Sequence, residues 1–317
     1  MISTEFLLWA IFGTLILILL ALDLGIFHRK SHEISIKEAL IWSLIWLVVA
    51  AVFNVLIYRW MGAESAIEFT AGYLVERTLS FDNLFIFLLV FSYFKVPSMY
   101  QYKVLFWGIL AALFMRGAFI IAGIELIDKF HWIIYLFGAF ILVTGFKMFV
   151  RKDGDEIDVE RNPVLKLCRK YLRTTDDYGD GNFFIRNADK LFATPLFIVL
   201  LVVETTDIIF AFDSVPAILG ITLNPFVVYT SNIFAILGLR SLYFALTGCL
   251  TMFHYLSHGV TVILIFIGTK MLLSGFYEID AGIALGVIVL ILAGSIGLSI
   301  ILPNGRSCKV KSGSNSK

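Results

Sequence analysis

Two apolar stretches of the sequence contain acidic side chains. They read GYLVERTLSFDNLFIF (residues 72–87) and VVETTDIIFAFDSVPAILG (residues 202–220). The groups in them that can bind a cation are Glu76, Asp82, Asn83, Glu204, Asp207 and Asp213. A charged side chain at the centre of a membrane helix costs roughly 2.5–3.5 kcal/mol even on the mildest scale. If these stretches span a membrane, the acids need a basic partner, a cation, a proton or water.

The donor atoms in these stretches narrow the choice of cation. Carboxylate and amide oxygens suit Mg²⁺, Ca²⁺ and Mn²⁺ better than Cu⁺ or Zn²⁺. Glu204 and Asp207 are three residues apart and share one face of a helix. Pro216 removes an amide hydrogen and frees a backbone carbonyl, so we expect a helix break beside Asp213. We therefore expect metal ligands among the six groups above, with Asp82, Asp207 and Asp213 first.

Ion pairing is the structural alternative to metal binding. Three arginines, Arg77, Arg116 and Arg240, lie at membrane depth. We expect Arg116 and Arg240 to balance the charge of the acids when no metal is bound. Five acids exceed three arginines, and this excess suits a cation that enters and leaves. Asp23, near the end of the first apolar run, fits a cap or water contact as well as a relay role.

The composition places these acids in a membrane. Hydrophobic residues make up 59% of the 317 residues and charged residues 15%, which is too apolar for a soluble domain. Several uncharged runs reach the roughly 20 residues that a bilayer core requires. We expect an all-α polytopic membrane protein. The predicted spans are 6–27, 39–58, 67–94, 103–124, 131–150, 193–220, 226–248, 255–275 and 281–302.

Lys and Arg in the short connections predict the orientation. They gather in residues 28–38 and in the tail, so the positive-inside rule places the N-terminus outside and the C-terminus in the cytoplasm. Residues 151–192 then form a long cytoplasmic loop, which we expect to be a solvated linker and a surface for protein partners. We expect residues 303–317 to be a flexible cytoplasmic tail. The net charge of +1 gives no sign of a nucleic-acid partner, and the oligomeric state stays open.

The three cysteines are far apart in the sequence. Cys168, Cys249 and Cys308 form no CxxC pair, so the sequence indicates neither a disulfide framework nor a thiolate metal site.

The sequence also contains an internal repeat. Residues 67–150 resemble residues 193–275, and the alignment matches Arg116 with Arg240 and Lys147 with Lys270. Because each unit has three predicted helices, the two copies would cross the membrane in opposite directions. Inverted repeats of this kind are typical of transporters, with the substrate site near the midplane where the copies meet.

The start of the repeat can be aligned in two registers. Matching SFDN with AFDS pairs Asp82 with Asp213 and Glu76 with Asp207. Matching VERT with VETT pairs Glu76 with Glu204 instead. We prefer the first register because it pairs two acids in each copy.

These segments, together with TSNIFAILGLRSLYF and FIGTKML, resemble the signature segments of the TerC family, and most of all those of its Alx-like bacterial members. The resemblance covers nearly the whole chain. The family is named for tellurite resistance, and its members are regarded as multi-pass inner-membrane proteins that export Mn²⁺. The resemblance therefore implies manganese efflux across a bacterial inner membrane. It also implies that the five acids above are the family's intramembrane acids.

Taken together, the sequence predicts a transporter that moves Mn²⁺ out of the cytoplasm through a midplane site. Mn²⁺ is then the transported substrate, and the protein is embedded in the lipid bilayer. We expect no permanently bound cofactor. The absence of HExxH, GxSxG and P-loop motifs argues against an enzyme. Coupling to protons is a further hypothesis. The alternative is an accessory membrane protein that delivers Mn²⁺ to, or assembles with, an export or insertion machinery.

Overall fold

The computed structural model describes residues 4–27, 36–150, 173–175, 177–187, 190–247, 255–277 and 279–301. The side chains of Asp23 and Asp82 lie outside this description, so their predicted roles stay predictions. The predicted tail 303–317 and residues 151–172 of the predicted loop also lie outside the described residues.

The described chain is built almost wholly of helices, as the sequence predicts for an all-α membrane protein. They are α1 (Thr4–Phe27), α2 (Ile36–Met61), α3 (Ala63–Tyr93), α4 (Ser98–Lys129), α5 (Ile133–Val150), α7 (Pro195–Leu219), α8 (Pro225–Leu237), α9 (Leu239–Thr247), α10 (Leu256–Leu273) and α11 (Ala281–Ile301). Within the described residues, six helical stretches are long and apolar enough to cross a membrane, and shorter apolar helices accompany them. The predicted spans lie on these helices, while the number of crossings stays a prediction.

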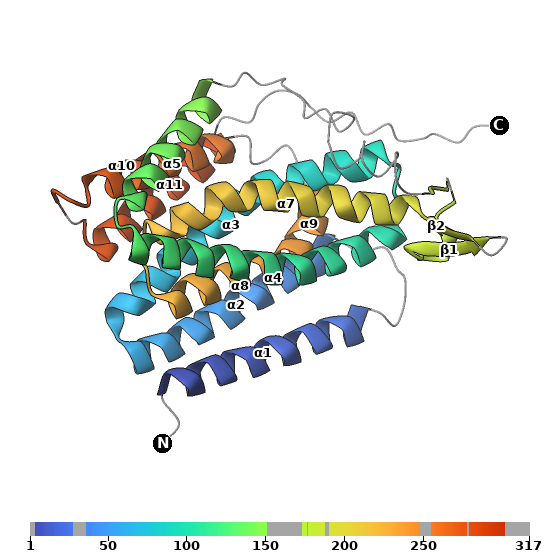
Figure 1. The fold of residues 1–317 in the computed structure, drawn as a ribbon, viewed down its shortest axis with the longest axis horizontal. Coiled ribbons are helices and arrows are strands. Elements are labelled where there is room, and N and C mark those ends of the chain that lie inside the picture. Colours follow the sequence, from blue (N-terminus) through green and yellow to red (C-terminus); the bar gives the residue numbers. More distant parts are fainter. Residues whose placement is uncertain are drawn as a thin grey trace.

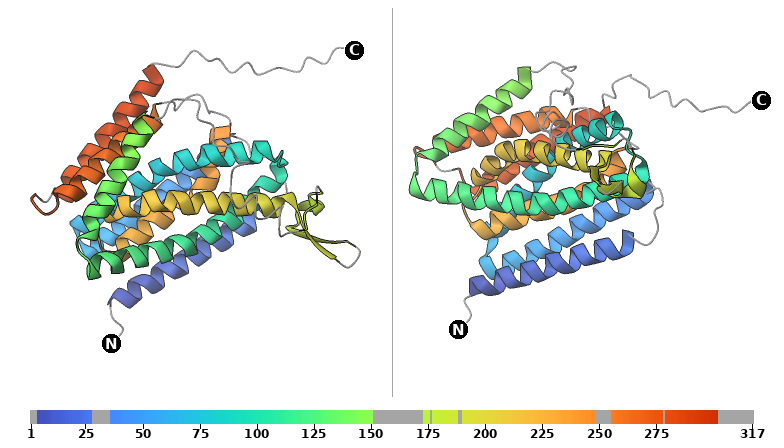
Figure 2. Two further views of the ribbon diagram at one scale, coloured as in Figure 1. Left: turned by 45° about the horizontal axis from the view of Figure 1, so that its top comes forward. Right: turned by 45° about the vertical axis from the view of Figure 1, so that its right-hand side comes forward.

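The central helices pack in a reciprocal pattern (Figure 1). Helix α3 packs against α8, α7 packs against α4, and α5 packs along α10. A pseudo-two-fold axis relating residues 67–150 to residues 193–275 would produce this pattern. Helices α1 and α2 lie at one side of the group, and α5, α10 and α11 lie together at another (Figure 2).

Glycines allow α5 and α10 to approach closely. A Cβ atom added at Gly268 would lie 2.8 Å from the carbonyl oxygen of Gly138 and 2.9 Å from the amide nitrogen of Leu142. A Cβ atom added at Gly145 would meet Ile265 at 2.9 Å. Small residues at helix contacts are the usual way for membrane helices to bring their backbones together.

The structure corrects the predicted helix break at Pro216. Helix α7 continues through Pro216 to Leu219, and the amide of Gly220 donates to the carbonyl of Pro216 at 3.0 Å. A proline this close to the end of a helix removes one backbone hydrogen bond without interrupting the helix. The break lies instead in the predicted span 226–248, where Gly238 separates α8 from α9.

Part of the predicted cytoplasmic loop is folded rather than a solvated linker. It forms a short 3₁₀ turn, η2 (Gly179–Gly181), and an antiparallel hairpin of β1 (Phe184–Asn187) and β2 (Lys190–Ala193). The hydroxyl of Tyr178 donates to the carbonyl of Phe94, and Lys103 Nζ donates to the carbonyl of Gly181 at 2.8 Å. These contacts join the segment to the connection between α3 and α4 and to the first part of α4.

The close approach of α5 and α10 can be tested with Gly268→Ala. The added methyl group would press against the backbone of α5, so we expect a loss of about 1–3 kcal/mol of stability, as for overpacked cores. Gly286→Ala in α11 is the matched control, because a Cβ atom there meets nothing within 4 Å. Thermal unfolding in detergent should show a lower midpoint for Gly268→Ala only. Equal midpoints for the two variants would contradict the packing.

Candidate functional site

A fully buried arginine lies at the centre of the helices. Arg116 on α4 is 0% exposed, and its Nε and Nη2 atoms donate to the two carboxylate oxygens of Asp207 at 3.3 and 3.0 Å. Its Nη1 atom donates to Oε1 of Glu76. Asp207 is the central residue of α7, and Glu76 lies on α3. One guanidinium group therefore joins an acid from each of the two predicted repeats.

Two neutral side chains complete this cluster. Asn232 on α8 donates from Nδ2 to Oε2 of Glu76 at 3.1 Å, and its Oδ1 atom accepts from Arg116 at 3.4 Å. Ser214 Oγ accepts from Arg116 at 3.3 Å. Buried charges persist only when they are paired and hydrogen-bonded in this way. With both carboxyls ionised, the cluster has one positive and two negative charges, which leaves a charge for one proton or cation to neutralise.

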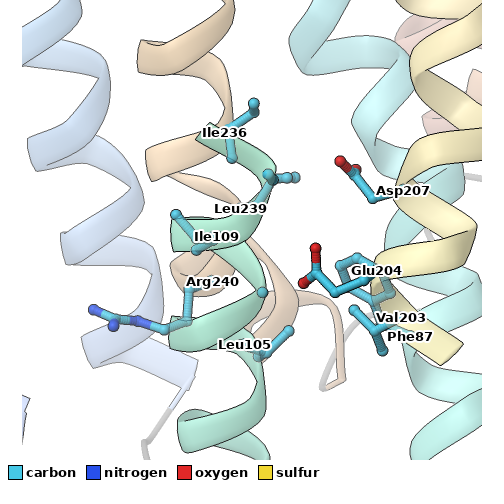
Figure 3. Close-up of a pocket in the computed structure, with 11 residues that line it drawn as sticks. Phe87, Leu105, Ile109, Val203, Glu204, Asp207, Ile236, Leu239 and Arg240 are labelled. Atoms are coloured by element: carbon cyan, nitrogen blue, oxygen red, sulfur yellow. The ribbon is translucent and has the colours of Figure 1, made fainter. Parts of the chain in front are cut away.

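Glu204 lies one turn before Asp207 and faces a small cavity. The cavity measures about 20 Å³ and is lined by both acids, by Arg240 and by apolar side chains that include Phe87 and Ile109 (Figure 3). The Oε1 atom of Glu204 is buried there and has no hydrogen-bond partner among the described residues. A cavity of this size has room for about one water molecule. This carboxylate is thus buried beside a space of the size of water or a bare cation.

Arg240 is the second arginine predicted to balance the charge of the acids. It lines the same cavity, but its guanidinium points away from Glu204 and Asp207 (Figure 3). Its Cζ atom lies 4.4 Å from the centre of the Tyr102 ring. Arg116 donates to Asp207 and Glu76, whereas the Arg240 guanidinium points away from Glu204 and Asp207 (Figure 3). The charge-balancing roles expected of the two arginines stay predictions.

Asp213 lies apart from the cluster. It is half-buried, and its Oδ1 atom accepts a hydrogen bond from Thr144 Oγ1 on α5 at 3.3 Å. Asp213 is six residues beyond Asp207, so the unbroken α7 turns its carboxylate toward another helix.

Asn83, the predicted neutral ligand, is buried on α3.

The predicted ligands whose side chains the structure describes do not gather into one metal site. Among the described residues, no group of three or more His, Cys, Asp and Glu side chains is placed to hold a metal ion. The pair Glu204 and Asp207 is what the structure brings to the cavity.

The contacts favour the second register of the repeat over the one we preferred. Glu76 contacts Asn232, while Glu204 Oε1 lies 3.1 Å from the position of a Cβ atom at Gly108. Asn232 and Gly108 each lie eight residues before the matched arginine of their unit. In this register Glu76 and Glu204 occupy matched positions of the two units, and Asp207 is an additional acid in the second unit.

Sequence reasoning did not select Asn232, Ser214, Gly108 or Thr144. Asn232 and Ser214 could have been selected from the sequence, because each is a polar side chain in an apolar span, which is the same signal that identified the acids. Gly108 and Thr144 carry no signal in a single sequence, since small residues are common in membrane helices.

Comparison with known proteins identifies the family. The model of the integral membrane protein TerC family matches residues 61–307. The chain belongs to the TerC family. It is 45% identical over 295 residues to an uncharacterized membrane protein of Myxococcus xanthus, covering 93% of this chain and 92% of that protein. No solved structure matches the chain.

Two further relatives carry a more specific name. The putative membrane-bound redox modulator Alx of Salmonella typhi is 42% identical over 315 residues, which cover 96% of this chain and 97% of the relative. The protein of the same name from Escherichia coli K12 is 43% identical over 291 residues, covering 89% and 90%. The chain is thus a multi-pass integral membrane protein of a bacterial family.

The central ion cluster can be tested with Arg116→Met. This change leaves two buried carboxylates without their cation, so we expect a loss of about 3–5 kcal/mol of stability. The additional change Asp207→Asn should restore part of it, because one uncompensated charge is then removed. Unfolding in detergent measures both effects.

Lys129→Met is the matched control for Arg116→Met. Lys129 pairs with Glu125 at 3.3 Å on the surface, where both side chains are exposed. Exposed pairs contribute only about 0–1 kcal/mol. If Arg116→Met were no more destabilising than this control, the buried ion cluster would not be essential to the stability of the fold.

Proposed function

We propose that this protein is a membrane transporter that exports Mn²⁺ from the cytoplasm across the bacterial inner membrane. The observation that carries the proposal is the buried Oε1 atom of Glu204, which has no hydrogen-bond partner among the described residues and faces a cavity beside Asp207. An acid in this position at membrane depth is typical of an ion pathway. The oxygen donors suit Mn²⁺, which is the cargo and not a resident cofactor.

The position of the cavity supports entry from the cytoplasm. Its α4 lining residues, Leu105 to Ala112, precede Arg116 and lie toward the end of the helix that contacts the η2 turn. In our proposed orientation, with the N-terminus outside and the C-terminus inside, this end faces the cytoplasm. A cation that enters there meets Glu204 before it meets Asp207 and the arginine.

Arg116 gives the pathway an exchangeable counter-ion. It holds Asp207 through two hydrogen bonds at 3.0 and 3.3 Å. A divalent cation on Glu204 and Asp207 would take over this neutralising role from the guanidinium. Asp207 then stays compensated both with and without cargo, which lowers the cost of keeping its charge in the membrane.

The name of the Salmonella typhi relative describes redox modulation instead. All three cysteines of this chain, Cys168, Cys249 and Cys308, lie outside the described residues. The described structure therefore offers no thiol site on which to build that role.

Glu204→Gln in proteoliposomes tests the export proposal. We expect Mn²⁺ flux to fall by about tenfold or more, because a charged ligand is replaced by a neutral one. The fold should survive, since Glu204 Oε1 accepts a hydrogen bond from no described group. A manganese-sensitive dye inside the vesicles measures the flux.

Glu125→Gln is the matched control for Glu204→Gln, because Glu125 is an exposed residue of α4 and should leave the flux unchanged. Equal flux through Glu204→Gln and wild type would contradict the proposed pathway. Vesicles that stay tight to Mn²⁺ even with the wild-type protein would favour the accessory role.

The unbalanced charge of the cluster also leads to a proposal of proton coupling. If a proton neutralises the acids on the return step, Mn²⁺ efflux should acidify the cytoplasmic side, and an inward proton gradient should accelerate it. Flux measured under imposed pH gradients of either sign checks this. Flux that is indifferent to the gradient would exclude the coupling and leave the export proposal standing.

A further inference from the structure

The two predicted repeats use their matched arginines differently. In the first unit, Arg116 donates to Glu76. In the register that the contacts favour, the equivalent pair of the second unit is Arg240 and Glu204. Both line one cavity, yet the Arg240 guanidinium points away from Glu204 (Figure 3). The equivalent ion pair is therefore made in one unit and not in the other.

The helices that carry these arginines also differ. Helix α4 runs without interruption from Ser98 to Lys129 and passes through Arg116. Its counterpart is broken at Gly238, two residues before Arg240, so that α9 is a separate short helix. The unbroken helix thus coincides with the arginine that binds its glutamate, and the broken helix with the arginine that does not.

Arg77 stabilises the break. Its Nη1 atom donates to the carbonyl of Ala235 at 3.0 Å, in the last turn of α8. The guanidinium fills the space at Gly238, where an added Cβ atom would overlap with it. The last carbonyls of a helix lack intrahelical partners and carry partial negative charge, so a cation here stabilises the end of α8.

We propose that the break at Gly238 is a switch between two arrangements of the protein. In the second arrangement α8 and α9 form a straighter helix, Arg240 leaves Tyr102 and pairs with Glu204, and Arg116 releases Glu76. Inverted repeats alternate access when one repeat rocks or gates against the other. In the proposed rearrangement, the side chain of Arg240 would fill the cavity beside Glu204. The inference rests on the proposed transport function and deepens it, because it names Arg240 as the positioning residue of the other state.

Arg240→Lys with a membrane-soluble carbodiimide tests the switch. The reagent joins a carboxylate and an adjacent amine as an amide, and it traps even a short-lived contact. Mass spectrometry of the full-length protein in vesicles should find the introduced lysine linked to Glu204. The link should be lost in Arg240→Lys with Glu204→Gln. The native pair Lys129 and Glu125, 3.3 Å apart, is the internal control for folding and reagent activity.

If the two ion pairs alternate, weakening the Arg116–Glu76 pair should favour the Arg240–Glu204 pair. Adding Glu76→Gln weakens the pair that holds the present arrangement, so the yield of the link to Glu204 should rise by about tenfold. No link to Glu204 where the Lys129–Glu125 link forms, or a yield that Glu76→Gln leaves unchanged, would overturn the switch. The link requires no Mn²⁺ flux, so a link that responds to Glu76→Gln in vesicles tight to Mn²⁺ would count against export alone.

Discussion

A guanidinium group enclosed between two carboxylates inside a membrane is the constraint on which this structure depends. Removing such groups from water costs several kcal/mol for each ion, and only close pairing with full hydrogen bonding returns that energy. Arg116, Asp207 and Glu76 meet this condition with the help of Asn232 and Ser214. Helices α3, α4, α7 and α8 must therefore cross at one depth and in one rotation. The reciprocal packing of α3 on α8 and of α7 on α4 supplies that geometry.

The same cluster links stability to function. It is charged, but it is not balanced, because two acids share one arginine. Glu204 adds a third acid one turn away, with its Oε1 atom buried at the edge of a small cavity. A protein selected for stability alone gains nothing from such a carboxylate, since apolar side chains of similar volume pack there at no electrostatic cost. In our proposal, the unbalanced charge is retained because a cation passes through.

Much of the fold and part of the site were accessible from the sequence. Runs of about 20 apolar residues identify spans. Charged residues inside a span identify a candidate site, because burying a charge in a membrane is costly and such residues usually serve a function. The pairing of acids with arginines depends on helix rotation and packing, which periodicity does not give. Asp213 shows this, since it turns toward Thr144 rather than toward Arg116. The break at Gly238 was hidden for a similar reason: it depends on Arg77 from a helix far away in the sequence, whereas Pro216 carried the conventional signal and breaks nothing.

The central claim is that Glu204 and Asp207 receive the cation in exchange for Arg116. A structure of the protein determined in the presence of Mn²⁺, with the anomalous signal of manganese, tests this most directly. The account predicts one manganese peak at bonding distance from carboxylate oxygens of Glu204 and Asp207, with Arg116 withdrawn from Asp207. A manganese peak elsewhere in the protein, with the Arg116–Asp207 hydrogen bonds intact, would contradict it.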